Sequence, residues 1–377
     1  MSGGVDSSVA AALLVAKGYD VTGAFMVNYE NEITQMGSSP ADDTDSKCWT
    51  GDYQDALRVA AKLGIPLMRL NFVKEYKKTV LDYMYDEYRK GRTPNPDVLC
   101  NKFVKFGVWL DKAKELGFDK LATGHYARLA NSPLGRGRGG LALMEAKDKN
   151  KDQTYFLHQL NQEQLKYVLF PIGEYTKPQI RKLAKKFGLP NADKEESMGI
   201  CFVGEVPMKE FLLKKIKPQK GKIVLSSHAS ATPPAPPLGN RGISTVIGEH
   251  DGLPFYTIGQ RNLNVKTDSN KPLYVVAKNF EKNELVVGYE DDPLLYKKTA
   301  EVSEVNWVSG QESILPLNCV VRLRHRQPLQ KCTVCRSDRS GGIPYTIKFK
   351  NPQRAVTSGQ FAVFYAKGEC LGGGVIN

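Results

Sequence analysis

The sequence predicts an α/β protein: a nucleotide-binding domain built on a parallel sheet, then a small linking domain, then a β-barrel-like C-terminal domain. Three observations support this. Helical and strand-like segments alternate over the first 200 residues, glycines follow the helical segments, and short strands separated by turns begin near residue 271. Alternation of helices and strands is typical of parallel sheets with helices on both faces, and serial short strands are typical of sandwiches and small barrels.

The elements of the first half follow from composition. Residues 9–17 are rich in alanine and leucine, which favour a helix, and Gly18 is a usual residue after a last helical turn. Residues 21–27 form an apolar run of strand length. The elements predicted after them are a helix over 53–63, a strand over 66–72, a helix over 104–116 and a strand over 120–123. Ligands of such sheets bind at the carboxyl ends of the strands.

The chain changes character after residue 204. Six lysines and one glutamate lie between residues 209 and 222, and Ser226–Pro237, with four prolines, follows as an insertion or linker. We therefore divide the chain into residues 1–203, a lysine-rich, nucleic-acid-binding central domain over 204–270, and a β domain over 271–377. The strands expected in the last domain are 273–277, 284–287, 319–323, 345–349 and 361–365.

Composition and charge limit the possible classes of protein. The 377 residues are 41% hydrophobic and 25% charged, a balance that excludes wholesale disorder and fibrous repeats. The longest purely apolar run, Val9–Ala16, is far too short to cross a bilayer, so we expect no membrane association. The net charge of +13 favours a polyanionic partner such as nucleic acid. Seven cysteines, an odd number, indicate a reducing compartment.

A glycine- and serine-rich segment at the start of the chain is the first functional motif. Ser2–Ser8 reads SGGVDSS and leads directly into the alanine-rich helix. Glycines let backbone N–H groups turn toward an anion, serines add hydroxyl donors, and a helix N-terminus favours negative charge. The Gly-Lys-Ser/Thr ending of a Walker loop is missing. The segment predicts a pyrophosphate-binding loop; a plain helix-capping turn is the alternative.

Cys100 and Cys201 lie in polar, turn-rich segments. Pro96 stiffens the backbone before Cys100, and Lys102 follows it, so we expect a thiol presented on a turn with a lowered pKa. Cys201 lies close to Lys194 in the sequence. We interpret both as reactive thiols. The alternative, a small buried hydrophobic residue, suits the other cysteines that we weighed, Cys48, Cys319 and Cys370.

Asp97 lies three residues before Cys100 and can hydrogen-bond a substrate base or move a proton. The alternative for a Pro-Asp pair is a turn or helix cap. Asn95 and Asp97 together offer donor and acceptor groups that match the edge of a uracil. We expect a catalytic role for Asp97.

Weaker signals remain open. His125 follows Gly124 at the end of a predicted strand and is either an acid–base group or a structural residue. Cys332 and Cys335 form a C-x-x-C without a second pair, so ordinary β-domain residues are favoured over a metal or redox site.

Two basic segments are candidate phosphate-binding surfaces. The lysines over 209–222, taken with Lys177 and its neighbours, form either a phosphate track or a solvated face. Strand alternation predicts Arg322, Arg324 and Arg326 on one face of the β domain as a second basic patch.

Several motifs together resemble one family. Ser2–Ser8 resembles the signature of PP-loop ATP pyrophosphatases, which adenylate a carbonyl or carboxylate oxygen and release pyrophosphate. Gly91–Lys102, GRTPNPDVLCNK, looks like the catalytic loop of tRNA-specific 2-thiouridylases. Further segments similar to that family, which extend the resemblance over nearly the whole chain, are Lys149–Leu157, Glu196–Phe202, Gly248–His250, Tyr256–Arg261 and Gly359–Tyr365.

The resemblance implies an ATP-dependent tRNA sulfurtransferase. It implies adenylation of the wobble uridine, a persulfide on Cys201, and Cys100 as nucleophile and resolving thiol that can form a disulfide with Cys201. Mg²⁺ is expected with the pyrophosphate, and no protein side chains are expected as metal ligands. A persulfide donor protein is an implied partner, and we expect a monomer. The implied nucleotide contacts are Ser2, Gly3, Gly4, Val5, Asp6, Ser7, Met26 and Gly124. The implied tRNA contacts are Asn95, Pro96, Asp97, Lys151, Asp152, Gln153, Arg324 and His325.

The chain departs from this family at its start. The family has an apolar strand before the Ser-Gly-Gly loop, whereas this chain begins at the loop, so we expect a truncated chain or a misassigned start. We expect the mitochondrial form of the family, with a cytoplasmic location as the alternative. Two other functions stay open: a PP-loop synthetase or amidotransferase for a small metabolite, and a tRNA-binding relative without activity.

Overall fold

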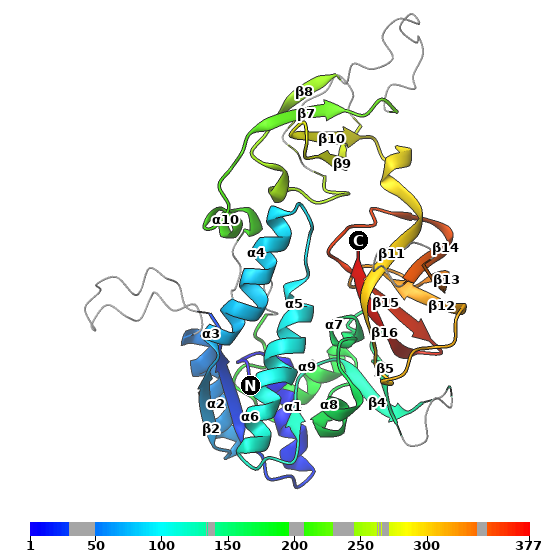
Figure 1. Ribbon diagram of the computed structural model, residues 1–377. Coiled ribbons are helices and arrows are strands. Elements are labelled where there is room, and N and C mark those ends of the chain that lie inside the picture. The colour runs from blue at the N-terminus through cyan, green and yellow to red at the C-terminus, as the bar shows by residue number, and fades with distance from the viewer. Residues whose placement is uncertain are drawn as a thin grey trace, which may run out of the picture.

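The computed structural model confirms the predicted fold class. It describes residues 1–29, 50–132, 134, 140–195, 207–228, 245–261, 263, 265, 271–337 and 345–377. An α/β part lies at the bottom of Figure 1, a four-stranded sheet at the top and a β-barrel at the right. None of the helices in the described ranges combines the length and apolar composition that a membrane crossing needs.

The α/β part contains two separate pairs of parallel strands in the described residues, where we expected one sheet. The first pair is β1 (Gly23–Val27) with β2 (Leu67–Asn71), and the second is β3 (Leu121–Ala122) with β6 (Val168–Leu169). The helices α1 (Val5–Ala16) and α2 (Thr50–Leu63) accompany them, close to their predicted bounds. Figure 1 shows α1 and α2 beside the first pair.

The third predicted helix begins earlier than composition indicates. In chain order it consists of α5 (Pro96–Leu99), a π-helical stretch (Cys100–Val108) and α6 (Trp109–Glu115). The Asn95 side chain caps α5 by accepting a hydrogen bond from the backbone N–H of Val98 at 3.3 Å. Pro96 occupies the first helical position, where its missing N–H costs nothing. Cys100 therefore lies one turn inside a helix, not on the predicted turn.

The remaining helices connect these elements. They are α3 (Val73–Tyr76), the π-helical Lys77–Leu81, α4 (Asp82–Arg89), α7 (Thr154–Leu157), α8 (Gln162–Tyr167), α9 (Lys177–Lys186) and α10 (Met208–Leu213). Thr176 and Gln179 form a capping box that starts α9, in which each side chain bonds the other residue's backbone N–H. This cap places Lys177 at the beginning of the helix.

The middle sheet corrects the predicted domain boundary at residue 270. Its strands are β7 (Gly221–Leu225), β8 (Val246–His250), β9 (Tyr274–Asn279) and β10 (Glu284–Gly288), in the order β8-β7-β10-β9. We expected the two later strands in the C-terminal domain. Val275 of β9 and Leu285 of β10 instead pack against Ile223 of β7, so this unit extends through Gly288.

The C-terminal sheet closes into the expected barrel. Its strands are β11 (Tyr296–Trp307), β12 (Leu317–Arg322), β13 (Gln330–Arg336), β14 (Tyr345–Arg354), β15 (Phe361–Ala366) and β16 (Glu369–Ile376). They follow the order β11-β14-β13-β12-β15-β16, and β11 pairs again with β16. A hairpin that we did not predict, β4 (Ala127–Asn131) and β5 (Leu141–Glu145), joins this sheet through β16.

The barrel and the α/β part share one hydrophobic core. Buried Tyr155 of α7 belongs to the same cluster as Val363 of β15. The Tyr155 hydroxyl lies within hydrogen-bond distance of the carbonyls of Leu323, at 3.3 Å, and Phe361, at 3.1 Å, which share its single proton. The two parts are therefore fixed against each other by apolar packing and by bonds to main-chain atoms.

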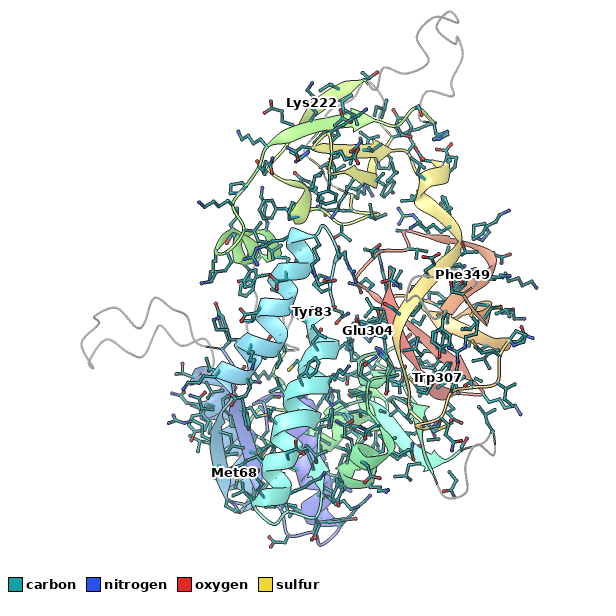
Figure 2. The ribbon with its side chains drawn as sticks, in the orientation of Figure 1. Met68, Tyr83, Lys222, Glu304, Trp307 and Phe349 are labelled. Atoms are coloured by element: carbon teal, nitrogen blue, oxygen red, sulfur yellow. The ribbon has the colours of Figure 1, made fainter. Side chains whose placement is uncertain are left out.

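A second core fills the barrel. The Trp307 ring stacks on Phe364 with the ring centroids 5.8 Å apart, and Phe349 packs in the same cluster. Figure 2 shows Trp307 and Phe349 within the barrel. These large aromatic side chains occupy its interior.

Candidate functional site

The glycine- and serine-rich loop lies at the N-terminus of α1. Gly3 has a φ of +73°, and Gly4 is the N-cap residue of the helix. The backbone N–H of Ser2 donates to the Ser7 hydroxyl at 3.1 Å, and that hydroxyl donates to the Gly4 carbonyl at 3.0 Å. No side chain caps the helix, so its first N–H groups are left for an external acceptor such as a phosphate oxygen.

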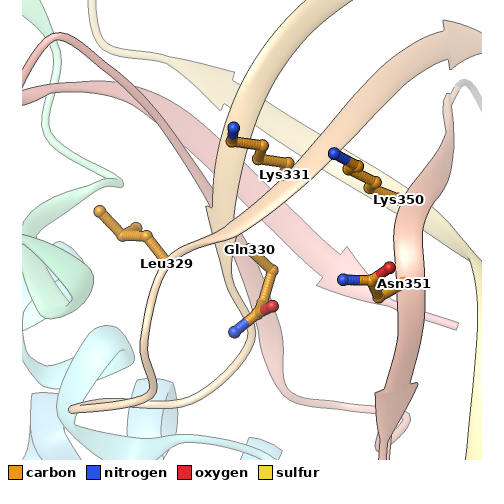
Figure 3. Close-up of a pocket in the computed structure, with 5 residues that line it drawn as sticks. All are labelled: Leu329, Gln330, Lys331, Lys350 and Asn351. Carbon is orange, nitrogen blue, oxygen red and sulfur yellow. The ribbon is translucent and has the colours of Figure 1, made fainter.

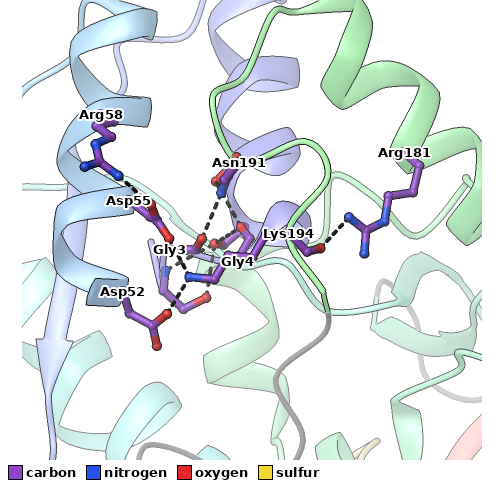
Figure 4. Close-up of polar contacts among 11 residues, drawn as sticks. Gly3, Gly4, Asp52, Asp55, Arg58, Arg181, Asn191 and Lys194 are labelled. Atoms are coloured by element: carbon purple, nitrogen blue, oxygen red, sulfur yellow. Dashed lines mark hydrogen bonds and ion pairs between the residues drawn. The ribbon is translucent and has the colours of Figure 1, made fainter. Parts of the chain in front are cut away.

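Three other segments hold this loop in place. The Asn191 amide donates to the Gly3 carbonyl at 2.8 Å and to the Ser8 hydroxyl at 3.0 Å, as Figure 4 shows. A Cβ on Gly124 would lie 2.7 Å from the backbone nitrogen of Ser7, so β3 ends directly against the loop. A Cβ on Gly3 would lie 2.2 Å from the carbonyl oxygen of Asp52. Only glycine fits at these two contacts.

Gly3→Ala is expected to weaken ATP use strongly. The substitution combines a positive φ, which costs on the order of 1–3 kcal/mol for other residues, with a clash against backbone atoms. ATP–pyrophosphate exchange measures the effect. Gly51→Ala is the matched control, because a Cβ there meets nothing within 4 Å. Equal exchange rates for the two variants would show that the loop takes no part in nucleotide use.

Two lysines that the sequence reasoning did not assign to this site lie beside the loop. The Lys177 ammonium bonds both carboxylate oxygens of Asp6, at 2.8 and 2.9 Å, and the Tyr126 hydroxyl donates to Asp6 at 3.0 Å. The Lys194 ammonium lies 2.6 Å from the carboxylates of Asp52 and Asp55 (Figure 4). The carboxylates thus position positive charge where a pyrophosphate would need it.

All three parts of the molecule meet at the segment that leads to Cys100. The backbone N–H of Thr93 donates to the Ser358 carbonyl at 2.9 Å, and the Gln360 amide donates to the Thr93 carbonyl at 2.9 Å. From the middle sheet, the Lys278 ammonium donates to the Gly91 carbonyl at 3.0 Å. Folding of the barrel and of the middle sheet therefore sets the position of this segment.

The Cys100 thiol is fully buried in the shared core, contrary to the prediction of a thiol presented on a turn. The residues that follow it are also held inward. The Asn101 amide donates to the Phe156 carbonyl at 3.2 Å, and the Lys102 ammonium donates to the Gln159 side chain at 3.0 Å. Burial lowers the pKa of Lys102. The apolar positions of this helix face the core and carry Cys100 with them.

A bulge in β11 brings a carboxylate toward the Cys100 segment, which no sequence signal indicated. The register of β11 against β16 shifts between Ser303 and Asn306, and Glu304 has a φ of +51°. Bulges of this kind re-aim side chains. Figure 2 shows Glu304 beside Tyr83 of α4, and its charge also acts on Lys102. Burial, with the nearby carboxylates of Glu87 and Glu304, raises the pKa of Tyr83 to about 12.

Comparison with known proteins identifies the family. Residues 1–205 match the tRNA methyl transferase HUP domain, residues 209–289 the tRNA methyl transferase PRC-barrel domain, and residues 297–376 the aminomethyltransferase beta-barrel domain. The whole chain is 44% identical to the tRNA-specific 2-thiouridylase MnmA of Levilactobacillus brevis and 42% identical to that of Acinetobacter baylyi, and it spans 94% and 95% of those proteins. The chain belongs to the tRNA-specific 2-thiouridylase family. The resemblance drawn from the sequence motifs is thereby confirmed.

The structure brings together most of the nucleotide contacts that membership of the 2-thiouridylase family implies. Residues 2–7 form one loop, and Gly124 lies against it. The Val5 side chain is buried in the core beneath α1, so only its backbone N–H remains for a ligand. Met26 lies in β1 and packs against the main core.

Two implied tRNA contacts are engaged inside the protein. The buried carboxylate of Asp152 pairs with Arg322 at 2.9 Å and accepts a hydrogen bond from the backbone N–H of Ala146 at 3.0 Å. The Gln153 side chain accepts a hydrogen bond from the backbone N–H of Tyr126 at 2.9 Å. These bonds favour a structural role for both side chains, which hold other parts of the protein in place, over direct contact with tRNA. Lys151, which precedes them in the chain, is half-buried.

The predicted arginine face on the barrel is wrong. Strand β12 ends at Arg322, whose side chain is buried, so the alternation does not continue to Arg326. Arg324 donates hydrogen bonds to the carbonyls of Ile258 and Ala355, both at 3.1 Å. The His325 ring packs against Phe156 with the ring centroids 4.5 Å apart and the ring planes tilted by 38°. Burial, helped by the nearby positive charge of Arg326, lowers the pKa of His325 to about 4. His325 is therefore neutral at physiological pH.

The other cysteines behave in different ways. Cys332 faces Cys319 across β12 and β13 with the two sulfur atoms 3.6 Å apart, and Cys335 lies on the opposite face of the strand. No metal-binding group of side chains is found in the described ranges. Cys370 is fully buried, as its alternative role predicts. The predicted reactivity of Cys201 and the predicted burial of Cys48 concern residues outside those described.

His125 is a structural residue. Its ring is buried between Phe106 and Phe170, and its Nδ1 lies 2.8 Å from the Thr123 hydroxyl. Burial, with a smaller contribution from Lys105, lowers the pKa of His125 well below its usual value. This ring is therefore neutral at physiological pH and packs among aromatic side chains.

The lysine run 209–222 is partly engaged within the protein. Lys209 forms an ion pair with Asp251, and the Lys214 ammonium lies 5.6 Å from the centre of the Phe211 ring. Lys217, Lys220 and Lys222 are also exposed, and Figure 2 shows Lys222 at the top of the molecule, on β7 of the middle sheet. The predicted phosphate track over this run stays a prediction.

Proposed function

We propose that this chain is an ATP-dependent tRNA sulfurtransferase that converts the wobble uridine of tRNA to 2-thiouridine. One observation carries the proposal: an anion-binding loop flanked by Lys177 and Lys194 occurs in the same compact part as the Asn95–Cys100 segment. The relatives' name, tRNA-specific 2-thiouridylase, supports the same activity.

The loop fits the pyrophosphate of ATP. Uncapped N–H groups at the start of α1 and the hydroxyls of Ser2 and Ser7 supply neutral donors, while Lys177 supplies positive charge. Mg²⁺ bound to the phosphates needs only one or two protein carboxylates, and Asp52 beside the loop is exposed enough to serve. This arrangement would hold the α-phosphate for attack by the uridine O2, which forms a C2–O–AMP ester and releases pyrophosphate.

Sulfur transfer then replaces the activated oxygen. The terminal sulfur of a Cys201 persulfide attacks C2, the C2–O bond breaks, and AMP leaves with both bonding electrons. The Cys100 thiolate then attacks the Cys201 sulfur. The bond between that sulfur and the sulfur on C2 breaks, its electron pair stays with the sulfur on C2, and the base becomes 2-thiouridine. A Cys100–Cys201 disulfide remains, which a thiol reductant returns to two thiols. Asp97, at the N-terminus of α5, is positioned in this scheme to hydrogen-bond the uracil.

Burial of Cys100 requires that the segment open during the cycle. Its side chain is fully enclosed in the core, and a disulfide requires sulfur-to-sulfur contact. We propose that tRNA binding displaces the Asn95–Cys100 segment and exposes the thiol. We also propose that a persulfide donor protein supplies the sulfur and that the enzyme acts as a monomer. A mitochondrial or a cytoplasmic location stays a prediction.

The test is thiolation of an unmodified tRNA anticodon stem-loop by the purified chain with ATP, Mg²⁺ and a persulfide donor. We expect 2-thiouridine at the wobble position and pyrophosphate release that depends on RNA. Exchange of pyrophosphate with ATP without any RNA, driven by a small metabolite, would favour a synthetase. RNA binding with neither exchange nor thiolation would favour an inactive relative.

A further inference from the structure

Two adjoining cavities in the barrel wall form one groove lined by lysines. The larger has a volume of about 850 Å³ and the smaller about 260 Å³, and both are lined by Lys331 and Lys350. Figure 3 shows these two side chains next to each other on β13 and β14. Lys348 and Lys367 also line the larger cavity. We call these four residues and the cavities between them the lysine groove.

The lysine groove carries positive charge without a counter-charge. All four side chains are exposed, and none forms an ion pair with a carboxylate in the part of the chain that the structure describes. No acidic residue lines either cavity. The groove is therefore open to an anionic partner.

The strand register adds to this charge density. Cys332 of β13 lies opposite Phe349 of β14, which places the next pair, Lys331 and Lys350, directly across from each other. Like charges at directly opposed positions destabilise a sheet. A negatively charged group between the two ammonium groups would remove this repulsion.

The groove also offers neutral donors along its length. Asn318 and Thr333 line the larger cavity, and Gln330 and Asn351 line the smaller one. Lys348 and Lys350 are two residues apart on one strand, so their Cα atoms are separated by roughly 7 Å. A row of cations and amide donors at such intervals suits the regular phosphates of a nucleic-acid strand.

We propose that the lysine groove binds the phosphate backbone of tRNA, outside the catalytic pocket; this rests on the proposed function. The groove begins at Leu329, four residues after His325, which the family resemblance names as a tRNA contact. RNA that reaches the turn between β12 and β13 can therefore continue along the barrel. Binding there is independent of sequence, because phosphates carry no base identity.

The experiment measures tRNA binding by the full chain as a function of salt. Lys331→Gln/Lys350→Gln is expected to reduce the slope of log affinity against log salt by roughly 1.8, because each lost duplex phosphate contact removes about 0.9. Lys297→Gln/Lys298→Gln, which removes the same charge from exposed positions on β11 of the same barrel, is expected to change the slope far less. The control Lys297→Gln/Lys298→Gln should thiolate tRNA at the wild-type rate.

The outcomes separate this proposal from the proposed function. An unchanged slope in Lys331→Gln/Lys350→Gln, or an equal loss in both double variants, overturns the groove as an RNA site. If that variant keeps the wild-type slope but loses binding to a poly-glutamate peptide, the groove is a protein-docking surface and the proposal is wrong. Failure of the wild-type chain to thiolate tRNA would instead overturn the proposed function.

Discussion

Replacing Cys100 by serine is expected to abolish multiple-turnover thiolation while ATP-dependent pyrophosphate release continues. A hydroxyl cannot enter thiol–disulfide exchange, so the persulfide bond has no resolving group. We expect a loss of at least about a thousandfold, which corresponds to roughly 4 kcal/mol of transition-state free energy. Quantification of 2-thiouridine and of pyrophosphate in the same reaction separates the two steps.

The matched control is Cys370→Ser. Cys370 is also fully buried and belongs to the same hydrophobic cluster as Cys100, so the serine hydroxyl meets a comparable environment. Thiolation per folded molecule should stay near the wild-type level in this variant. In wild-type protein, one turnover without reductant should leave a Cys100–Cys201 disulfide that peptide mass mapping detects. Undiminished turnover in Cys100→Ser would exclude Cys100 as the resolving thiol.

Arg322→Met is expected to cause the largest loss of stability of any variant considered. Its guanidinium lies between the carboxylates of Asp152, at 2.9 Å, and Glu145, at 3.5 Å, and all three side chains are at least nine-tenths buried. Methionine would leave the buried carboxylate of Asp152 without its cation, whereas Glu145 would keep its ion pair with Lys149. Breaking such a pair from one side typically costs about 3–5 kcal/mol. Urea unfolding followed by circular dichroism measures the loss.

Arg336→Met is the control for this variant. Arg336 pairs with Glu312 on the same barrel, but its side chain is 61% exposed, and exposed ion pairs contribute about 1 kcal/mol or less. Arg322→Met/Asp152→Asn should recover part of the lost stability, because the amide carries no charge. A loss below about 1 kcal/mol in Arg322→Met would contradict the assignment of Arg322 as a buried structural cation.

The same contacts connect the barrel to the nucleotide loop. Asp152, held by Arg322, precedes Gln153, whose side chain accepts from the Tyr126 backbone, and the Tyr126 hydroxyl donates to Asp6. Loss of Arg322 should therefore also raise the KM for ATP. Normal ATP kinetics in a destabilised Arg322→Met protein would show that this chain of bonds serves folding alone.

Local sequence patterns were sufficient for α1, α2, β1, β2 and the anion loop. Glycine and serine before an alanine-rich helix specify a helix N-terminus without a side-chain cap, and this depends on only a few adjacent residues. Three strands of the barrel, β12, β14 and β15, likewise follow from short apolar runs. The assignment of β9 and β10 to the wrong domain had a different origin, since strand partners far apart in the chain leave no local signal.

The sequence by itself determined the fold class, the family and the loop at the start of α1, because the motifs that indicate them consist of neighbouring residues. Only the tertiary structure decided that Cys100 is enclosed, that Arg322 is a buried counter-ion, and that Lys177 reaches Asp6. Burial and ion pairing arise between segments distant in sequence. The pKa and the solvent exposure of a charged side chain or a thiol depend on those contacts, and a local sequence pattern does not show them.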